Sequence, residues 1–305
     1  MTPDEYTIKE TMLQVGEGHK IYVQQWGKKS VRNPIIFLHG GPGSGCSDSH
    51  KSYFNPTKQQ VIFFDQRGCG KSLPYGDLEH NTTDKLVEDI LKILDYFSIQ
   101  KATFVGGSWG SALALYFGIK RPKMVKAMVL RGIFTARSSE INFLEQGGFQ
   151  AFFPEVWDRF AESVPSKFSE NPRDYHMPRV LGKDKKASKQ SAYEYMLLEG
   201  SIISLDDRTK LDTFEKFDPV STIIECHYMA NQCFMPENYI MDNASKLVMP
   251  VYLIQGRYDA ICPAYTALEL SKVLPNAQLQ WTVAGHSGND RNNWEAVHSI
   301  VQTVS

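Results

Sequence analysis

The 305-residue sequence predicts an α/β fold in which helices cover both faces of a mostly parallel central sheet and a helical cap is inserted into the chain. Three observations predict this architecture. Short apolar runs end in glycine or polar residues, segments with helical spacing separate them, and the alternation stops in the middle of the chain before it returns near the end. Alternating strands and helices are typical of a parallel sheet with helices on both sides.

The first half of the chain supplies most of the expected sheet. Residues 34–39 and 61–65 are continuous apolar runs, which indicate central strands buried on both faces. Residues 22–26 alternate between apolar and polar side chains and predict a further strand. Apolar residues between 85 and 98 recur on one helical face, and Thr83 is the expected N-cap of this helix. The next expected elements are a strand over residues 102–105, a helix over 111–119 and a strand over 125–130.

The middle of the chain has helical rather than strand signals and is rich in aromatic, methionine and charged side chains. Its polar stretch at residues 182–186 predicts a solvated loop. We therefore expect a cap of residues 134–245, inserted into a core domain of residues 1–133 and 246–305. After the cap we expect a strand over 251–254, a helix over 265–273, a strand over 278–283 and a last helix over 292–301.

Composition limits the partners of this protein. The formal net charge is −1 at pH 7, which argues against binding to nucleic acid or to an anionic membrane surface. Neither a run of about 18 apolar residues nor a signal-peptide pattern occurs, so no membrane span and no secretion are expected. The five cysteines include no C-x-x-C pair, which favours reduced thiols in a cytoplasmic protein over disulfides. No His/Glu cluster has metal-ligand spacing, and we expect no metal and no other cofactor.

The strongest chemical signal is GGSWG at residues 106–110, a G-x-S-x-G motif between an expected strand and an expected helix. This is the context of the nucleophile elbow of the α/β-hydrolase fold, in which a sharp turn exposes the serine hydroxyl. The small flanking residues let the strand and the helix pack closely. We therefore expect Ser108 to be a nucleophile and the fold to be that of an α/β hydrolase.

A serine nucleophile needs a base, and the base needs an orienting acid. In this fold the acid and then the histidine follow the serine along the chain. Asp259 comes just after one expected strand and His286 just after the next. Because ligand sites of doubly wound sheets lie at the carboxyl ends of the strands, we expect Ser108, Asp259 and His286 to form a catalytic triad.

Acyl transfer also requires hydrogen-bond donors for the developing oxyanion. The HGGPG segment at residues 39–43 follows an expected strand, and its glycines allow the backbone to approach a substrate closely. We assign the backbone N–H groups of Gly41 and Trp109 as the two donors of an oxyanion hole.

Together these motifs resemble those of the prolyl aminopeptidases, also called proline iminopeptidases, over nearly the whole chain. The resemblance is carried by HGGPG at 39–43, DQRGCGKS at 65–72, GGSWGS at 106–111, GRYD at 256–259 and GHS at 285–287. It implies a serine peptidase that releases an amino-terminal residue, preferably proline, from small peptides. The implied mechanism passes through an acyl-enzyme and needs no metal.

The same family holds the free amine of its substrate with carboxylates of the cap. Residues 198–200 match its W-E-G element, and residues 225–229 match its E-x-H-Y-F element. The resemblance therefore implies that Glu199 and Glu225 bind the substrate amine. It also implies that Phe134 and Met229 line the substrate pocket.

The chain departs from the family pattern at three places in the cap. Leu198 stands for the family's tryptophan, Met229 for its phenylalanine, and Glu145-Gln146 for its Tyr-Gln pair. Fewer rigid aromatic side chains and a flexible methionine define a pocket less tightly. The resemblance therefore implies the hydrolase chemistry more firmly than a strict preference for proline.

Other functions remain open at this point. A broader esterase or amidase would share the triad and differ in the cap, whereas an epoxide hydrolase or dehalogenase would need Asp at position 108. A binding protein on an inactive hydrolase scaffold is opposed by the presence of all three triad residues. Three cysteines adjoin the motifs, and we expect at least one of Cys46, Cys69 and Cys262 to lie near the mouth of the active site.

Overall fold

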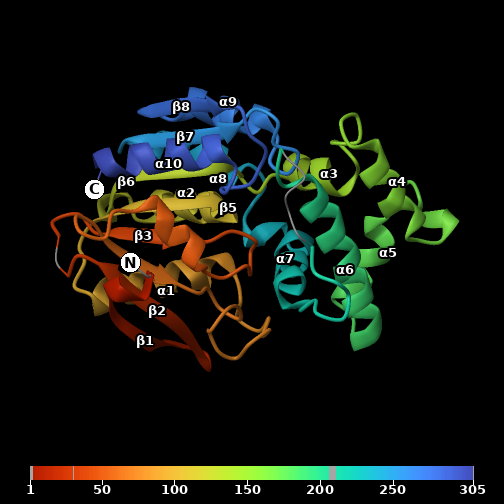
Figure 1. The fold of residues 1–305 in the computed structure, drawn as a ribbon, viewed down its shortest axis with the longest axis horizontal. Helices are drawn as coiled ribbons and strands as arrows, with labels where there is room; N and C mark the ends of the chain where they lie inside the picture. Colours follow the sequence, from red (N-terminus) through yellow and green to blue (C-terminus); the bar gives the residue numbers. More distant parts are fainter. Residues whose placement is uncertain (1–2, 30, 206–210, 305) are drawn as a thin grey trace.

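The computed structural model describes residues 3–29, 31–205 and 211–304 of the chain. At its centre is an 8-stranded sheet with the strand order β1-β2-β4-β3-β5-β6-β7-β8 (Figure 1). β2 runs antiparallel to β1 and to β4, and the other neighbouring strands are parallel. This confirms the mostly parallel sheet of an α/β hydrolase.

The predicted strands all form, and their bounds differ from the prediction by a few residues. β1 was not predicted, because it is an edge strand whose side chains are nearly all exposed or half-buried and lack a clear apolar pattern. The strands are β1 (Thr7–Gly16), β2 (His19–Gly27), β3 (Ile35–Leu38), β4 (Gln60–Phe64), β5 (Ala102–Ser108), β6 (Val125–Ile133), β7 (Val251–Gly256) and β8 (Ala277–Thr282).

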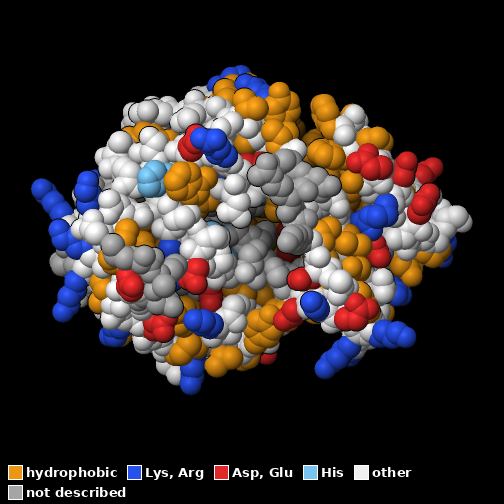
Figure 2. Space-filling model, viewed as in Figure 1, with side chains coloured by type: hydrophobic (Ala, Val, Ile, Leu, Met, Phe, Trp, Pro, Cys, Tyr) orange, Lys and Arg blue, Asp and Glu red, His pale blue; other side chains and the backbone are white. Residues whose placement is uncertain are grey.

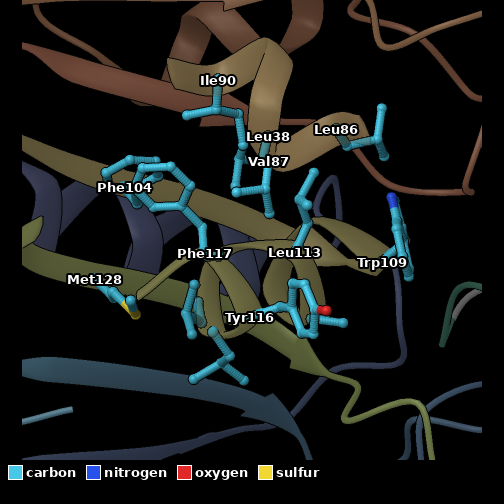
Figure 3. Packing of buried hydrophobic residues seen from close by; sticks show 14 of the residues in the cluster. Leu38, Leu86, Val87, Ile90, Phe104, Trp109, Leu113, Tyr116, Phe117 and Met128 are labelled. Atoms are coloured by element: carbon cyan, nitrogen blue, oxygen red, sulfur yellow. The ribbon is translucent and has the colours of Figure 1, made fainter. Parts of the chain in front are cut away.

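Helices pack on both faces of the sheet, as predicted. α1 (Thr83–Tyr96), α2 (Trp109–Lys120) and α9 (Ala264–Val273) share one core cluster with the sheet, and α10 (Arg291–Val304) packs on the opposite face. Figure 3 shows Phe117 of α2 beside Phe104 of β5, with ring centroids 4.8 Å apart. The prediction of Thr83 as the N-cap of α1 was wrong. Thr82 is the N-cap, and the Thr83 hydroxyl donates a hydrogen bond to the Cys233 carbonyl 2.5 Å away.

The described residues between β6 and β7 form helices, which lie beside the sheet in Figure 1. The five larger ones are α3 (Ser138–Glu145), α4 (Pro154–Glu162), α5 (Arg173–Val180), α6 (Lys185–Ile202) and α7 (Val220–Ala230). They enclose an apolar cluster of their own that includes Phe149, Phe160 and Tyr195. The short helix α8 (Tyr239–Asn243) instead contributes Ile240 to the core cluster of the sheet.

The stretch 182–186 is exposed as expected, but it is not all loop, since α6 begins at Lys185. Asp184 is the N-cap of α6 and accepts hydrogen bonds from the backbone N–H groups of Lys186 and Ala187. The division into a core domain (1–133 and 246–305) and a cap (134–245) stays a prediction.

Glycines allow close backbone contacts between β5, α2 and β3 at the point where β5 turns into α2. A Cβ atom at Gly106 would lie 2.6 Å from the Gly110 carbonyl oxygen, and one at Gly110 would overlap the Leu38 carbonyl oxygen of β3. Both obstacles are backbone atoms, which cannot rotate away. The G-x-S-x-G spacing is therefore a packing requirement of the fold, whatever chemistry the serine performs.

We predict that Gly110→Ala lowers the free energy of unfolding by about 1–3 kcal/mol, the usual cost of overfilling a packed site. Gly118→Ala, in the same helix, is the matched control. There the added methyl meets the ends of the Met128 and Leu247 side chains, which can move, and alanine favours the helix by about 1 kcal/mol. Urea unfolding of the two variants measures the difference. An equal loss of stability in both would contradict the packing argument.

Candidate active site

Ser108 lies at the junction of β5 and α2 with backbone angles φ 57° and ψ −127°. A non-glycine residue in this region is strained, and such strain persists only where the surrounding structure enforces it. The half-buried serine lines a cleft together with residues of α6 and α7. The N-terminus of α2 also favours negative charge at this point.

The structure brings the other two predicted triad residues together beside this cleft. Nδ1 of His286, after β8, lies 2.8 Å from Oδ2 of Asp259, after β7, and both side chains are buried. An ionised aspartate accepts the proton of Nδ1, which leaves Nε2 as the basic nitrogen of the ring. His286 and Ser108 line the same cleft. The geometry is that of a base oriented by an acid, on the same cleft as a serine hydroxyl.

Gln255, at the end of β7, holds the aspartate in place and was not predicted. Its Nε2 donates hydrogen bonds to Asp259 Oδ2 (3.1 Å) and to the Cys262 carbonyl (2.9 Å), while its Oε1 accepts one from the Ile133 N–H (2.8 Å). The other carboxylate oxygen of Asp259 accepts from the N–H groups of Ile261 and Cys262. A polar side chain at the end of an otherwise apolar strand was the signal that could have identified Gln255.

The two predicted oxyanion donors come from two neighbouring segments, the HGGPG turn and the start of α2. Gly41 lines the cleft with Ser108, and Trp109 is the first residue of α2, where a backbone N–H has no acceptor within the helix. Gln66 ties the two segments together. Its Nε2 donates to the His39 carbonyl (3.1 Å), and its Oε1 accepts from Trp109 Nε1 (2.9 Å). The HGGPG turn and the nucleophile turn are thus fixed to each other through one buried amide.

The cleft has two connected parts, which we call the inner pocket and the outer cleft. The inner pocket has a volume of about 40 Å³, and the outer cleft, with His286 on its wall, about 440 Å³. Both are lined by Ser108, Glu199 and Glu225. The predicted pocket residues Phe134 and Met229 lie on the inner pocket, together with Ile141, Leu144 and Ile261. A small apolar group bound there would adjoin both the serine and the carboxylates.

Four carboxyl groups line the inner pocket, and one of them, Glu140, forms an ion pair with the arginine three residues before it. Burial, followed by the charge of Glu145, raises the pKa of Glu199 to about 7. Burial and the neighbouring Glu199 and Glu145 raise the pKa of Glu225 well above its usual value. Burial raises the pKa of Glu145 to about 7, although Nε of Arg173, 2.6 Å from its Oε2, opposes the rise. Glu145 was not predicted as a site residue, although it occupies one of the positions where the chain departs from the family pattern.

A cation would stabilise the ionised forms of these carboxyl groups, since Glu199 and Glu225 have no ion-pair partner among the described residues. The site is therefore complementary to an ammonium group that arrives with a substrate.

All five cysteines are free thiols. Of the three cysteines expected near the mouth of the active site, Cys262 lines the inner pocket and none lines the outer cleft; Cys226, which was not predicted, also lines the inner pocket. Cys46 and Cys69 lie away from the pocket, where their thiols donate to the carbonyls of Phe64 and Gln66. Burial raises the pKa of the Cys226 and Cys262 thiols, which keeps them protonated and unreactive at neutral pH.

Within the described ranges, no cluster of three or more His, Cys, Asp or Glu side chains could hold a metal ion. The described helices include none that is long and apolar enough to cross a membrane. Acidic and basic side chains are interspersed over the face seen in Figure 2.

Comparisons with known proteins agree with this geometry. A family model described as an alpha/beta hydrolase fold matches residues 33–290. The chain is 37% identical over 291 residues to a proline iminopeptidase of Arabidopsis thaliana, covering 91% of this chain and 75% of the relative. It is 35% identical over 306 residues to a proline iminopeptidase of Neisseria gonorrhoeae, covering 98% of each. An esterase from Exiguobacterium antarcticum has a similar fold, with a TM-score of 0.67, 18% identity and coverage of 97% and 99%.

Proposed function

This chain belongs to the proline iminopeptidase family of α/β hydrolases, and we propose that it releases the amino-terminal residue, preferably proline, from small peptides with a free amino terminus. One observation carries this proposal. Glu199 and Glu225 line the same cleft as Ser108, on both the inner pocket and the outer cleft. An amine held by these carboxylates would leave the carbonyl of its own residue within reach of the serine.

The proposed mechanism is acyl transfer through a serine ester. Nε2 of His286 removes the proton of Ser108 as the hydroxyl oxygen attacks the scissile carbonyl, and Asp259 stabilises the resulting imidazolium. The N–H groups of Gly41 and Trp109 stabilise the oxyanion. His286 then gives its proton to the leaving amine, and the C–N bond breaks. Water, deprotonated by His286, hydrolyses the ester and releases the free amino acid.

The inner pocket supports the preference for a small amino-terminal residue. Its walls of Phe134, Ile141 and Met229 suit one compact apolar group such as a pyrrolidine ring. Met229 can adapt its shape, so other small residues would also fit.

A broader esterase or amidase is the second candidate, and one observation favours it. Burial and the neighbouring Glu199 and Glu145 raise the pKa of Glu225, which favours the uncharged form of this carboxyl in the empty pocket. A neutral carboxyl can donate a hydrogen bond to an uncharged acyl group without any amine. The two functions differ in whether the substrate must carry a positive charge. The expected cytoplasmic location stays a prediction under either.

Glu225→Gln separates the two functions, because it keeps the size and hydrogen bonding of the side chain and removes the charge. A charge-assisted contact contributes about 1.5–3 kcal/mol, so we predict that kcat/KM for a prolyl amide with a free amine falls about tenfold or more. The kcat/KM for a small neutral ester should barely change. Glu194→Gln on the outer side of α6, where Glu194 pairs with Arg159, is the matched control.

The same experiment can be read as a double-mutant cycle between enzyme and substrate. Acetylating the substrate amine should cost the wild-type enzyme far more than it costs the Glu225→Gln variant. An equal loss on both substrate classes would make Glu225 a structural residue, and the esterase function would then fit better.

The pH dependence gives a further prediction. The pKa of Glu199 is raised to about 7, so this carboxyl gains its proton as the pH falls through neutrality and loses its attraction for an ammonium group. We predict that kcat/KM for a prolyl amide, divided by kcat/KM for a neutral ester, rises between about pH 5 and about pH 7.5, below the pKa near 8 of an α-amino group. The ratio removes the pH dependence of the catalytic steps that both substrates share. Glu199→Gln should flatten the curve. A ratio independent of pH in the wild-type enzyme would contradict the proposal that Glu199 and Glu225 bind the substrate amine.

A further inference from the structure

A second cavity opens from the outer cleft on the α10 face of the sheet, and we call it the side chamber. It has a volume of about 90 Å³ and is lined by Phe37, His50, Tyr53, Arg131 and Asn289, among others. It shares Gly40, His50, Arg131 and Gly288 with the outer cleft, so the two spaces meet at these residues. The chamber has room for several water molecules or for one small polar group.

Arg131 brings an unpaired positive charge to this chamber. The residue lies on β6 opposite Gly107, the neighbour of the nucleophile, and its guanidinium Nη1 donates a hydrogen bond to the His286 carbonyl. No ion pair in the described part of the chain includes Arg131. A half-buried guanidinium usually pairs with a carboxylate or phosphate, because its planar donors match two oxygen atoms at once. Arg131 lines both the side chamber and the outer cleft.

The neighbours of Arg131 do not neutralise it. His50 is uncharged, because burial and then the charges of His39 and Arg131 lower its pKa to about 4. The Tyr53 hydroxyl donates to the Gly288 carbonyl, and burial raises the pKa of this tyrosine. Glycine at positions 107 and 288 leaves space against the guanidinium, since a Cβ at Gly288 would lie 3.2 Å from Arg131 Nε. The chamber therefore presents one positive charge and no negative one.

Charges of both signs line the outer cleft, where Glu199, Glu225 and Arg131 lie together with Ser108. Glu199 and Glu225 line the inner pocket, whereas Arg131 lines the side chamber, and Ser108 lies on the cleft that connects them. A dipeptide likewise carries charges of both signs, with its amine on one side of its single peptide bond and its carboxylate on the other. Because consecutive Cα atoms are about 3.8 Å apart, the carboxylate of a dipeptide lies within one residue of the bond that Ser108 attacks.

We propose that Arg131 binds the α-carboxylate of the leaving residue, so that the enzyme prefers free dipeptides over longer or carboxyl-blocked peptides. The inference rests on the proposed aminopeptidase function and adds a subsite for the leaving group. The carboxylate accepts hydrogen bonds from the guanidinium at the mouth of the side chamber and leaves with the released amino acid. The two carboxylates that bind the amine and the guanidinium that binds the carboxylate together select a peptide with both charges at the separation found in a dipeptide.

The test compares prolylglycine with prolylglycinamide, which differ only in the terminal carboxylate. We expect the wild-type enzyme to have a kcat/KM at least about tenfold higher for prolylglycine, the factor given by about 1.4 kcal/mol. Arg131→Met should bring the ratio of the two values close to one, and Arg131→Lys should keep part of the preference. Arg291→Met, which removes an exposed arginine of α10 that pairs with Glu295, is the control and should keep the full ratio.

The ratio distinguishes binding of a carboxylate from support of the triad. If Arg131 only holds the His286 carbonyl, Arg131→Met lowers kcat on both substrates equally and leaves their ratio unchanged, which overturns the proposal. A wild-type enzyme that cleaves both substrates equally well overturns it without any variant. Failure to cleave either substrate, with activity on neutral esters, would instead refute the aminopeptidase function.

Discussion

The close contact of β3, β5 and α2 around the nucleophile is the constraint on which the rest of the site depends. Gly106 and Gly110 let the backbone of α2 approach the Leu38 carbonyl, and this approach forces Ser108 to φ 57°. The strained turn directs the hydroxyl into the cleft and leaves the Trp109 N–H free at the start of α2. Gln66 then fixes Trp109 to the HGGPG turn, so nucleophile and oxyanion donors share one rigid support.

Electrostatics decides what this hydrolase scaffold would accept. Burial, together with charge repulsion at Glu199 and Glu225, raises the pKa values of three of the four carboxyl groups that line the inner pocket, which reflects a free-energy cost in the empty enzyme. Arg173 offsets part of it for Glu145 alone. A substrate ammonium would offset the remaining cost of burying these carboxylates, so binding of the correct substrate would gain electrostatic free energy that the empty pocket does not have. Specificity would then come from the cap, while the chemistry comes from the sheet.

The sequence predicted those features that local chain geometry determines. The triad could be assigned because each residue follows a strand in a fixed order, and the sheet because its central strands are continuous apolar runs. β1 was missed because an exposed edge strand carries little apolar pattern. Cys226 and Arg131 could not be assigned, since each meets the site through residues far away in the chain. Gln255 lies only four residues from Asp259, and its position at the end of an apolar strand was the one local signal for it. Glu145 appeared only as a departure from a family motif, and only the fold brings it beside Glu199 and Glu225.

The central claim is that one cleft joins a serine nucleophile to an amine-binding pair of carboxylates. The most direct measurement is the rate at which a fluorophosphonate labels the enzyme, with the labelled residue identified by peptide mass mapping. The account predicts labelling at Ser108 that prolinamide slows and that N-acetylprolinamide, which lacks the charged amine, leaves nearly unchanged. Labelling at another residue, or equal protection by both ligands, would contradict it.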